Sequence, residues 1–153
     1  MNRSAKSDMA KLVPELIVSD FVRSLRFYTE VLGFKQLYDR PEEDFAYLDR
    51  DGAQIMIDQR SSDGERDWVP ADLEYPYGRG MNLEIEVENV DALLASCIRH
   101  GARIFLAIEE KWYRRDALLM GVRQFIVMDP DGYLLRLSQS LGTRSIVGES
   151  SDG

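Results

Sequence analysis

Cysteine and histidine are scarce in this chain, which has one of each among its 153 residues. Because Cys97 has no partner, a disulfide framework within the chain is excluded, which is typical of proteins of a reducing cytosol. Cys97 lies in an apolar helical stripe, and this favours a buried structural thiol over a nucleophile. The longest apolar runs have strand length, and residues 1–7 lack the apolar segment of a signal peptide. We therefore expect a cytoplasmic protein that does not engage a membrane.

Positive charge is also in short supply. The chain has 19 Lys and Arg against 27 Asp and Glu, so its net charge is -8 at pH 7. Nucleic-acid binding and docking on anionic lipid both need clustered Lys and Arg, so neither partner is expected. An acidic surface favours cationic partners, although it is also common in soluble proteins for the sake of solubility alone. With 44% hydrophobic residues, the chain is long enough for one well-filled compact domain.

Two repeated sequence patterns indicate that the chain contains a duplicated module. The tetrad Asp-x-Asp-Gly occurs at 49–52 and at 129–132, and each copy is followed by an alternating apolar run. The segment from 16 to the glycine at 33 is likewise echoed by the segment from 83 to the glycine at 101. Duplication places equivalent positions of the two modules around a shared cleft.

Local patterns predict a βαβββ order in each module. In the first, Asp20 caps a helix that Gly33 ends, and 51–52 is a hairpin signal. In the second, Asn89 caps a helix with Val90, Leu94 and Cys97 on its buried stripe. The predicted strands are 13–18, 34–39, 44–49, 53–59, 81–87, 103–107, 122–128 and 133–139. We expect modules at 11–60 and 80–142, a linker loop at 61–79, and flexible tails at 1–10 and 143–153.

Alternation along the strands separates an apolar face from a polar one, because successive side chains point to opposite sides. The apolar, helix-covered positions are Leu16, Val18, Ile55, Ile57, Leu83, Ile85, Val87, Leu135 and Leu137. The opposite positions are Glu15, Gln54, Met56, Asp58, Asn82, Glu84, Glu86, Arg136 and Ser138. We expect an α+β fold in which two βαβββ modules form a curved, cup-shaped mixed sheet with helices on the outer face and a ligand in the cup. A polar face that is simply wet, the default for antiparallel sheets, stays open as the alternative.

Three segments carry a resemblance to a known family. They are VPELIVSD at 13–20, FYTEVLGF at 27–34 and DPDGYL at 129–134. Together with the paired βαβββ modules, they resemble the vicinal oxygen chelate superfamily, which includes glyoxalase I, extradiol dioxygenases, fosfomycin resistance enzymes and bleomycin resistance proteins. The similarity covers roughly residues 11–142 and implies the fold more than the reaction, because this fold hosts many chemistries.

Enzymes of this superfamily hold a divalent metal with His, Gln or Glu side chains from the first and last strands of both modules. Counting from the shared motifs places these positions at Val13, Met56, Asn82 and Arg136. None is a standard ligand, and the guanidinium of Arg136 has no lone pair to donate. The only histidine, His100, is expected in an exposed place at a helix end. These departures from the family pattern predict no metal, no cofactor and no catalytic residue.

Metal-less members with a similar opening segment look like bleomycin resistance proteins, which sequester a bulky cationic glycopeptide in an acidic crevice. This resemblance implies an antibiotic-resistance type of protein that binds a cationic or zwitterionic small molecule, as a homodimer with crevices built from both chains. Trp112, in a loop expected after the sixth strand, and Trp68 in the linker are the candidate stacking residues. The predicted ligand-binding residues are Glu15, Met56, Asp58, Asn82, Glu84, Trp112 and Arg136.

Other functions stay open. Positive charge near the presumed mouth, at 111–115, and Arg136 in the cup are equally compatible with an anion-bearing or zwitterionic metabolite, and we expect Arg136 to pair with a carboxylate of the cup. The main alternative is a glyoxalase-like or dioxygenase-like enzyme, with either a relocated metal at Glu15, Asp58 and Glu84 or a carboxylate/Arg acid-base site. A third possibility is a structural or regulatory protein with a vestigial cup.

Overall fold

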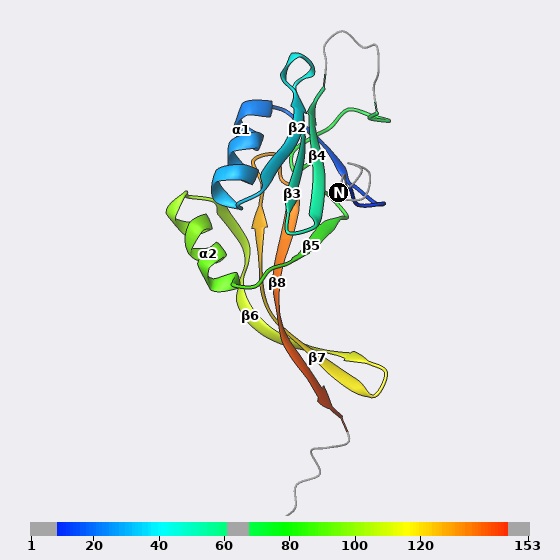
Figure 1. Cartoon of the computed structure of the whole chain (residues 1–153), viewed down its shortest axis with the longest axis vertical. Coiled ribbons are helices and arrows are strands. Elements are labelled where there is room, and N and C mark those ends of the chain that lie inside the picture. Colours follow the sequence, from blue (N-terminus) through cyan, green and yellow to red (C-terminus); the bar gives the residue numbers. More distant parts are fainter. Residues whose placement is uncertain (1–8, 61–67, 147–153) are drawn as a thin grey trace, which may run out of the picture. The chain divides into compact units, whose positions relative to one another are not determined.

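The computed structural model describes residues 9–60 and 68–146 and has an α+β fold with two four-stranded mixed sheets (Figure 1). The chain divides into two compact units, and each is described by itself. Unit 1 comprises residues 1–79 together with 129–133, and unit 2 comprises residues 80–128 together with 134–153. Most of the predicted tails and residues 61–67 of the predicted linker lie outside the described residues.

Unit 1 contains the first sheet, with strand order β1-β4-β3-β2. Its elements are β1 (Glu15–Val18), α1 (Phe21–Arg26), the π-helical turn η2 (Phe27–Val31), β2 (Lys35–Arg40), the 3-10 turn η3 (Pro41–Glu43), β3 (Phe45–Arg50) and β4 (Ala53–Gln59). Strand β1 runs parallel to β4, and the other two pairs are antiparallel. The predicted helix start is confirmed, because the Asp20 carboxylate accepts a hydrogen bond of 3.1 Å from the backbone N–H of Arg23.

The hairpin predicted from Asp51 and Gly52 is also confirmed. Both residues have positive φ, 49° and 93°, which is the geometry of the tight hairpin turns whose twist matches that of the flanking strands. Arg50 pairs with Ala53, and this turn therefore fixes the register of the whole β3–β4 pair.

Unit 2 contains the second sheet, with strand order β5-β8-β7-β6. Its elements are β5 (Asn82–Glu86), α2 (Val90–Arg99), β6 (Arg103–Arg115), β7 (Leu118–Met128) and β8 (Leu134–Ser145). Asn89 caps α2 as predicted, with a 3.0 Å bond from the backbone N–H of Ala92. The buried stripe contains Leu93 where Leu94 was expected, because the helix turns the i+3 position toward the sheet.

The sixth strand is longer than predicted. It was expected to end at 107 with residues 111–115 in a loop, and this was wrong, since β6 continues to Arg115 and pairs with β7 along its length. Two register shifts, between Ile104 and Leu106 and between Leu106 and Glu109, interrupt the alternation at the place where the pattern had indicated a strand end. Strand β8 likewise runs to Ser145, beyond the expected end of the second module.

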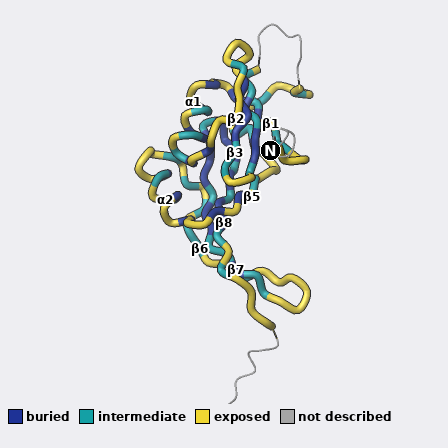
Figure 2. Tube along the Cα trace, viewed as in Figure 1, coloured by how far each residue is buried: buried dark blue, intermediate teal, exposed yellow. Residues whose placement is uncertain are grey.

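Buried positions lie mainly along the strands (Figure 2), and the predicted apolar faces are buried except at Leu83, which is half-buried. Leu16, Ile57, Leu135 and Leu137 are at most 1% exposed. Cys97 is buried in α2, and burial raises the pKa of its thiol to about 11, so it stays protonated and inert at neutral pH. None of the helices in the described ranges is long and apolar enough to cross a membrane.

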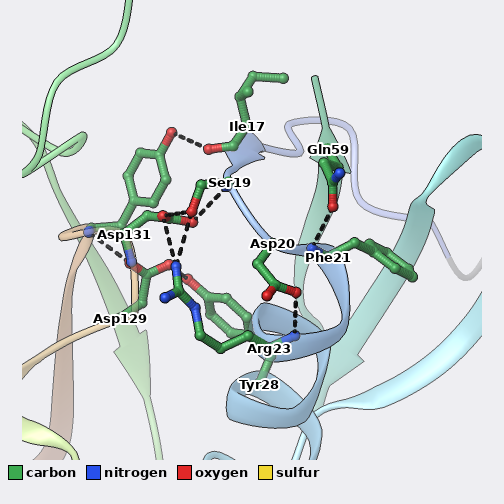
Figure 3. A network of polar contacts seen from close by, with 10 residues as sticks. Ile17, Ser19, Asp20, Phe21, Arg23, Tyr28, Gln59, Asp129 and Asp131 are labelled. Atoms are coloured by element: carbon green, nitrogen blue, oxygen red, sulfur yellow. Dashed lines mark hydrogen bonds and ion pairs between the residues drawn. The ribbon is translucent and has the colours of Figure 1, made fainter. Parts of the chain in front are cut away.

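The turn between β7 and β8, residues 129–133, belongs to unit 1 and is held there by a buried carboxylate (Figure 3). One oxygen of Asp129 accepts backbone bonds from Asp131 at 2.9 Å and Tyr133 at 2.8 Å, and the other accepts the Tyr28 hydroxyl at 2.7 Å. Burial raises the pKa of Asp129 to about 6, against the opposing effect of these bonds. The second copy of the Asp-x-Asp-Gly tetrad thus holds this turn in place through contacts with a distant part of the chain.

A second carboxylate extends this cluster toward the start of α1. Asp131 accepts bonds from the backbone N–H of Ser19 at 2.9 Å and from its hydroxyl at 2.5 Å, and Arg23 adds an ion pair at 3.2 Å (Figure 3). Only glycine fits at 132, where φ is +90° and an added Cβ would lie 2.5 Å from the Cβ of Pro76. These contacts fix the turn against β1 and the N-terminus of α1.

Candidate functional site

The face of the first sheet that no helix covers brings three predicted ligand residues together. Glu15 of β1 lies beside Met56 of β4, and Ile17 lies beside Asp58, so the Glu15 and Asp58 side chains are diagonal neighbours. The two carboxyl groups are close enough for each to influence the pKa of the other. The sequence prediction of an acidic, uncovered face is thus realised in unit 1.

The pKa values of both carboxyl groups are raised. Burial is the main cause that raises the pKa of Glu15, and the hydrogen bond and negative charge of Asp58 add to it. Burial also raises the pKa of Asp58, against the lowering effects of the Glu15 hydrogen bond and the Arg40 charge. Each carboxyl group therefore releases its proton at a higher pH than an isolated one, and a cation bound beside them favours the ionised form of both.

An aromatic row beside the carboxyl pair was not predicted. In β3, Phe45 is the register partner of Asp58, and Tyr47 is that of Met56. Tyr38 of β2 stacks on Tyr47 with ring centroids 5.1 Å apart and planes 15° apart. The signal was present in the sequence, because counting back across the hairpin at 51–52 puts Phe45 and Tyr47 in phase with Met56 and Asp58.

This surface already accommodates one cation of the chain itself. The Arg40 guanidinium lies 4.0 Å from the centroid of the Phe45 ring and 2.6 Å from a carboxylate oxygen of Glu43. Cation–π contact and a carboxylate are thus combined around a positive group at the edge of the face. Tyr38, which is 40% exposed, is the accessible ring of the row.

The uncovered face of the second sheet carries the other predicted polar residues. Arg136 of β8 donates to Glu84 of β5 at 2.7 Å, which confirms that Arg136 pairs with a carboxylate of this face. Asn82 lies two residues before Glu84 on the same strand and is exposed. The pair is partly solvated, because 28% of the Arg136 side chain and 50% of the Glu84 side chain are exposed, so it contributes little to the stability of the fold.

Trp112 is placed differently from expectation. Trp112 lies within β6, and its ring covers Gly121 so closely that an added Cβ there would be 2.5 Å away. The guanidinium of Arg144 lies 3.9 Å from the Trp112 ring centroid, so one face of this ring is occupied by a cation of the same chain. Tyr113, the next residue, therefore points to the opposite face of the strand, the one that carries Arg136. Trp68 is 65% exposed in the segment before β5.

The residues at the expected metal positions do not fit a divalent cation. The side chain of Val13 offers no donor atom, and Arg136 is positively charged and paired with Glu84. The amide of Asn82 and the thioether of Met56 are each weak ligands for a divalent cation. In the part of the chain that the structure describes, no three His, Cys, Asp or Glu side chains cluster closely enough to hold a metal.

The chain is similar to a known protein family and to several solved structures. Residues 10–137 match the family model of the Glyoxalase/Bleomycin resistance protein/Dioxygenase superfamily. A member of that superfamily from Vibrio splendidus 12B01 is 34% identical, covering 84% of this chain and 97% of its own, with a TM-score of 0.39. A protein of unknown function from Agrobacterium tumefaciens str. C58 is 30% identical, covering 87% and 95%, with a TM-score of 0.64. TioX from Micromonospora sp. ML1 shares the fold at 22% identity, covering 86% and 99%, with a TM-score of 0.62. No curated protein matches the chain.

Proposed function

Because this chain belongs to the glyoxalase/bleomycin resistance protein/dioxygenase superfamily, we propose that it is a metal-free binding protein of the bleomycin-resistance type, which sequesters a cationic or zwitterionic small molecule. The observation that carries the proposal is the placement of Glu15 and Asp58 as diagonal neighbours, each with a raised pKa, on an uncovered, aromatic sheet face. A ligand cation stabilises the ionised form of both carboxylates.

The aromatic row supports the same ligand class. A planar cation gains from contact with a ring face as well as from the carboxylates, and Tyr38 presents an accessible ring. The missing donor set at Val13 and Arg136 supports binding without a metal. We include a homodimer in the proposal, because β2 and β6 are sheet edges that a second copy can cover. The proposal also includes a cytoplasmic location.

Benzamidine, a small planar cation, is the probe that tests the proposal. In an NMR titration it is expected to shift the resonances of β1 and β4, and Glu15→Gln is expected to weaken its binding roughly tenfold by removing one charge-assisted contact. Asp51→Asn is the matched control, because it removes one negative charge from the exposed turn of the same unit, and its φ of 49° suits asparagine. Equal affinities for wild type and Glu15→Gln, or equal losses in both variants, would contradict the proposal.

The affinity for benzamidine is also expected to fall on acidification at a higher pH than that of an ordinary glutamate, whose pKa is 4.5. Burial and Asp58 raise the pKa of Glu15, so this carboxyl group takes up its proton and loses its charge earlier as the pH falls. Benzamidine itself stays cationic throughout. Titrations at a series of pH values measure the midpoint, and a midpoint at or below that of ordinary glutamate would contradict the raised pKa of Glu15.

The same pair supports a second candidate function, acid-base catalysis. A carboxyl group with a raised pKa beside an ionised partner can give up and recover a proton at neutral pH. An enzyme of this kind exchanges the carbon-bound hydrogens of a 2-hydroxy ketone with deuterium from solvent, and Glu15→Gln abolishes the exchange. Hydroxyacetone in deuterated buffer, followed by proton NMR, separates this function from simple binding.

A further inference from the structure

Gln124 of β7 is a buried polar residue on the uncovered face of the second sheet. Its neighbour Arg123 bonds Asp91 of α2 at 2.8 Å, so the side chain of Gln124 points away from the helix. The residue is only 2% exposed. Its amide nitrogen donates to a carboxylate oxygen of Glu109 at 3.0 Å and to the hydroxyl of Tyr113 at 2.8 Å.

These bonds fix the orientation of the amide. A carboxylate accepts hydrogen bonds and donates none, so the NH₂ group of Gln124 must face Glu109. The carbonyl oxygen Oε1 then points elsewhere, and it is buried with no hydrogen-bond partner among the described residues. A buried carbonyl without a donor costs free energy, which a ligand that supplies the donor recovers.

Gln54 of β4 shows which group satisfies an oxygen of this kind. It is a buried glutamine on the uncovered face of the first sheet, and its amide nitrogen also donates to a carboxylate, that of Asp49 at 2.9 Å. Its oxygen, however, is occupied by the backbone N–H of Ala10 at 2.7 Å and by the Tyr47 hydroxyl at 2.5 Å. In unit 1 the chain itself therefore provides an amide N–H that Gln124 lacks.

Arg136 places an unused donor close to this unused acceptor. Its Nη2 atom bonds Glu84, but its Nε atom is buried without a partner in the described part of the chain. Gln124 is the register partner of Ser138, and Ile126 that of Arg136, so Gln124 and Arg136 are diagonal neighbours on adjacent strands. Side chains in such positions are within reach of one small group.

The two unpaired atoms, Gln124 Oε1 and Arg136 Nε, and the charges around them specify which chemical group could bind between them. It must donate to Gln124 and accept from Arg136, so it carries an N–H and a C=O on the same side. Glu84, Glu86 and Glu109 outnumber the positive charges of Arg136 and Lys111 on this face, so a neutral carbonyl is favoured over a carboxylate. A primary carboxamide or a lactam has this cis arrangement, whereas an ordinary trans peptide bond points the two groups apart.

We propose that Gln124 and Arg136 form a binding site for a primary carboxamide or lactam group. Gln124 Oε1 accepts the ligand N–H, and Arg136 Nε donates to the ligand carbonyl. The Tyr113 hydroxyl accepts a bond from the amide of Gln124, and in the proposal this residue, 41% exposed, moves aside when the ligand enters. The inference rests on the proposed function only in that the uncovered faces receive a small molecule.

Benzamide, N,N-dimethylbenzamide and benzoate form the test series, with NMR of the full chain as the readout. Benzamide is expected to shift the side-chain amide signals of Gln124 and the Nε–H signal of Arg136. N,N-dimethylbenzamide, which has no donor, and benzoate, which is an anion, are each expected to bind about tenfold more weakly. Equal binding of the dimethyl compound, stronger binding of benzoate, or no benzamide shift at these two residues would overturn the proposal.

Gln124→Met removes the acceptor at similar volume, and Gln54→Met is the matched control. Benzamide is expected to raise the Tm of the wild type and of Gln54→Met but to leave that of Gln124→Met unchanged. Loss of the benzamide response in both variants would mean that Gln124 acts only through the fold, and would overturn the proposal. Benzamidine reports on Glu15 and Asp58, so its binding without that of benzamide contradicts this inference alone, and the reverse result contradicts the proposed function alone.

Discussion

Replacing Asp129 by alanine is expected to lower the free energy of unfolding by about 3–5 kcal/mol. The residue is 3% exposed and accepts bonds from the Tyr28 hydroxyl and from two backbone N–H groups of its own turn. Alanine leaves these donors without an acceptor, and the Tyr28 ring is fully buried, so its hydroxyl cannot turn to water. Urea denaturation followed by circular dichroism measures the loss.

Asp129→Asn is the control that separates hydrogen bonding from charge. Asparagine keeps the oxygen that accepts the two backbone bonds of the turn, so a much smaller loss is expected than for alanine. A loss as large as that of Asp129→Ala would show that the negative charge, and not the turn geometry, is the stabilising feature. A negligible loss in Asp129→Ala would show that this turn is not held by the buried carboxylate.

The wild type and Asp129→Asn are also expected to differ in how their free energy of unfolding depends on pH. The pKa of Asp129 is about 6 in the fold against 3.8 in the unfolded chain, so burial favours the protonated form. The stability that protonated Asp129 contributes is fully present below its pKa in the unfolded chain, and it is lost as the pH rises through its pKa in the fold. Lowering the pH from about 7 to about 4 should therefore stabilise the wild type relative to Asp129→Asn, by at most about 3 kcal/mol. A difference that is constant across this range would contradict the raised pKa.

Leu135→Ala is expected to cost about 2–5 kcal/mol, as for other buried leucine truncations. Leu135 is 0% exposed on the helix-covered face of β8, and it lies beside Leu83 of β5 and Val127 of β7. The truncation leaves a cavity between the sheet and α2. Thermal and urea unfolding measure the cost.

Arg136→Ala, one residue along, is the matched control on the uncovered face. It breaks a partly solvated ion pair with Glu84, which is expected to cost less than about 1 kcal/mol. The contrast between neighbouring residues tests the phase of the strand directly. A small cost for Leu135→Ala together with a large one for Arg136→Ala would mean that the two faces are inverted.

The parts of the fold that sequence reasoning predicted correctly depend on local chemistry. The caps Asp20 and Asn89 act on N–H groups of the next turn, and Asp51-Gly52 has the positive φ values that a tight hairpin needs. The buried phase of β4 and β8 follows from alternation alone. Such features are visible within a few residues of sequence, which is why they could be read without the structure.

The parts that were missed depend on pairing between distant segments. The end of β6 was misplaced because two register shifts break its alternation, and Trp112 was consequently assigned to a loop. The tertiary partner of Asp129 is Tyr28, 101 residues away, and no local pattern announces that bond. Phe45 and Tyr47 join the acidic face only through the β3–β4 register. A candidate site made of side chains from several strands can therefore be outlined from the sequence, but naming its aromatic and amide members requires the register between strands. The hairpin at 51–52 supplies that register for Phe45 and Tyr47, whereas the irregular β6–β7 pair does not supply it for Gln124.

The measurement that tests binding without a metal most directly combines elemental analysis with a binding titration. Protein purified without chelators is analysed for divalent metals, and its affinity for benzamidine is measured before and after treatment with EDTA. The proposed function predicts no stoichiometric metal and one affinity in both states, because Glu15 and Asp58 bind the cation themselves. One metal per chain, whose removal abolishes the binding of benzamidine, would contradict it.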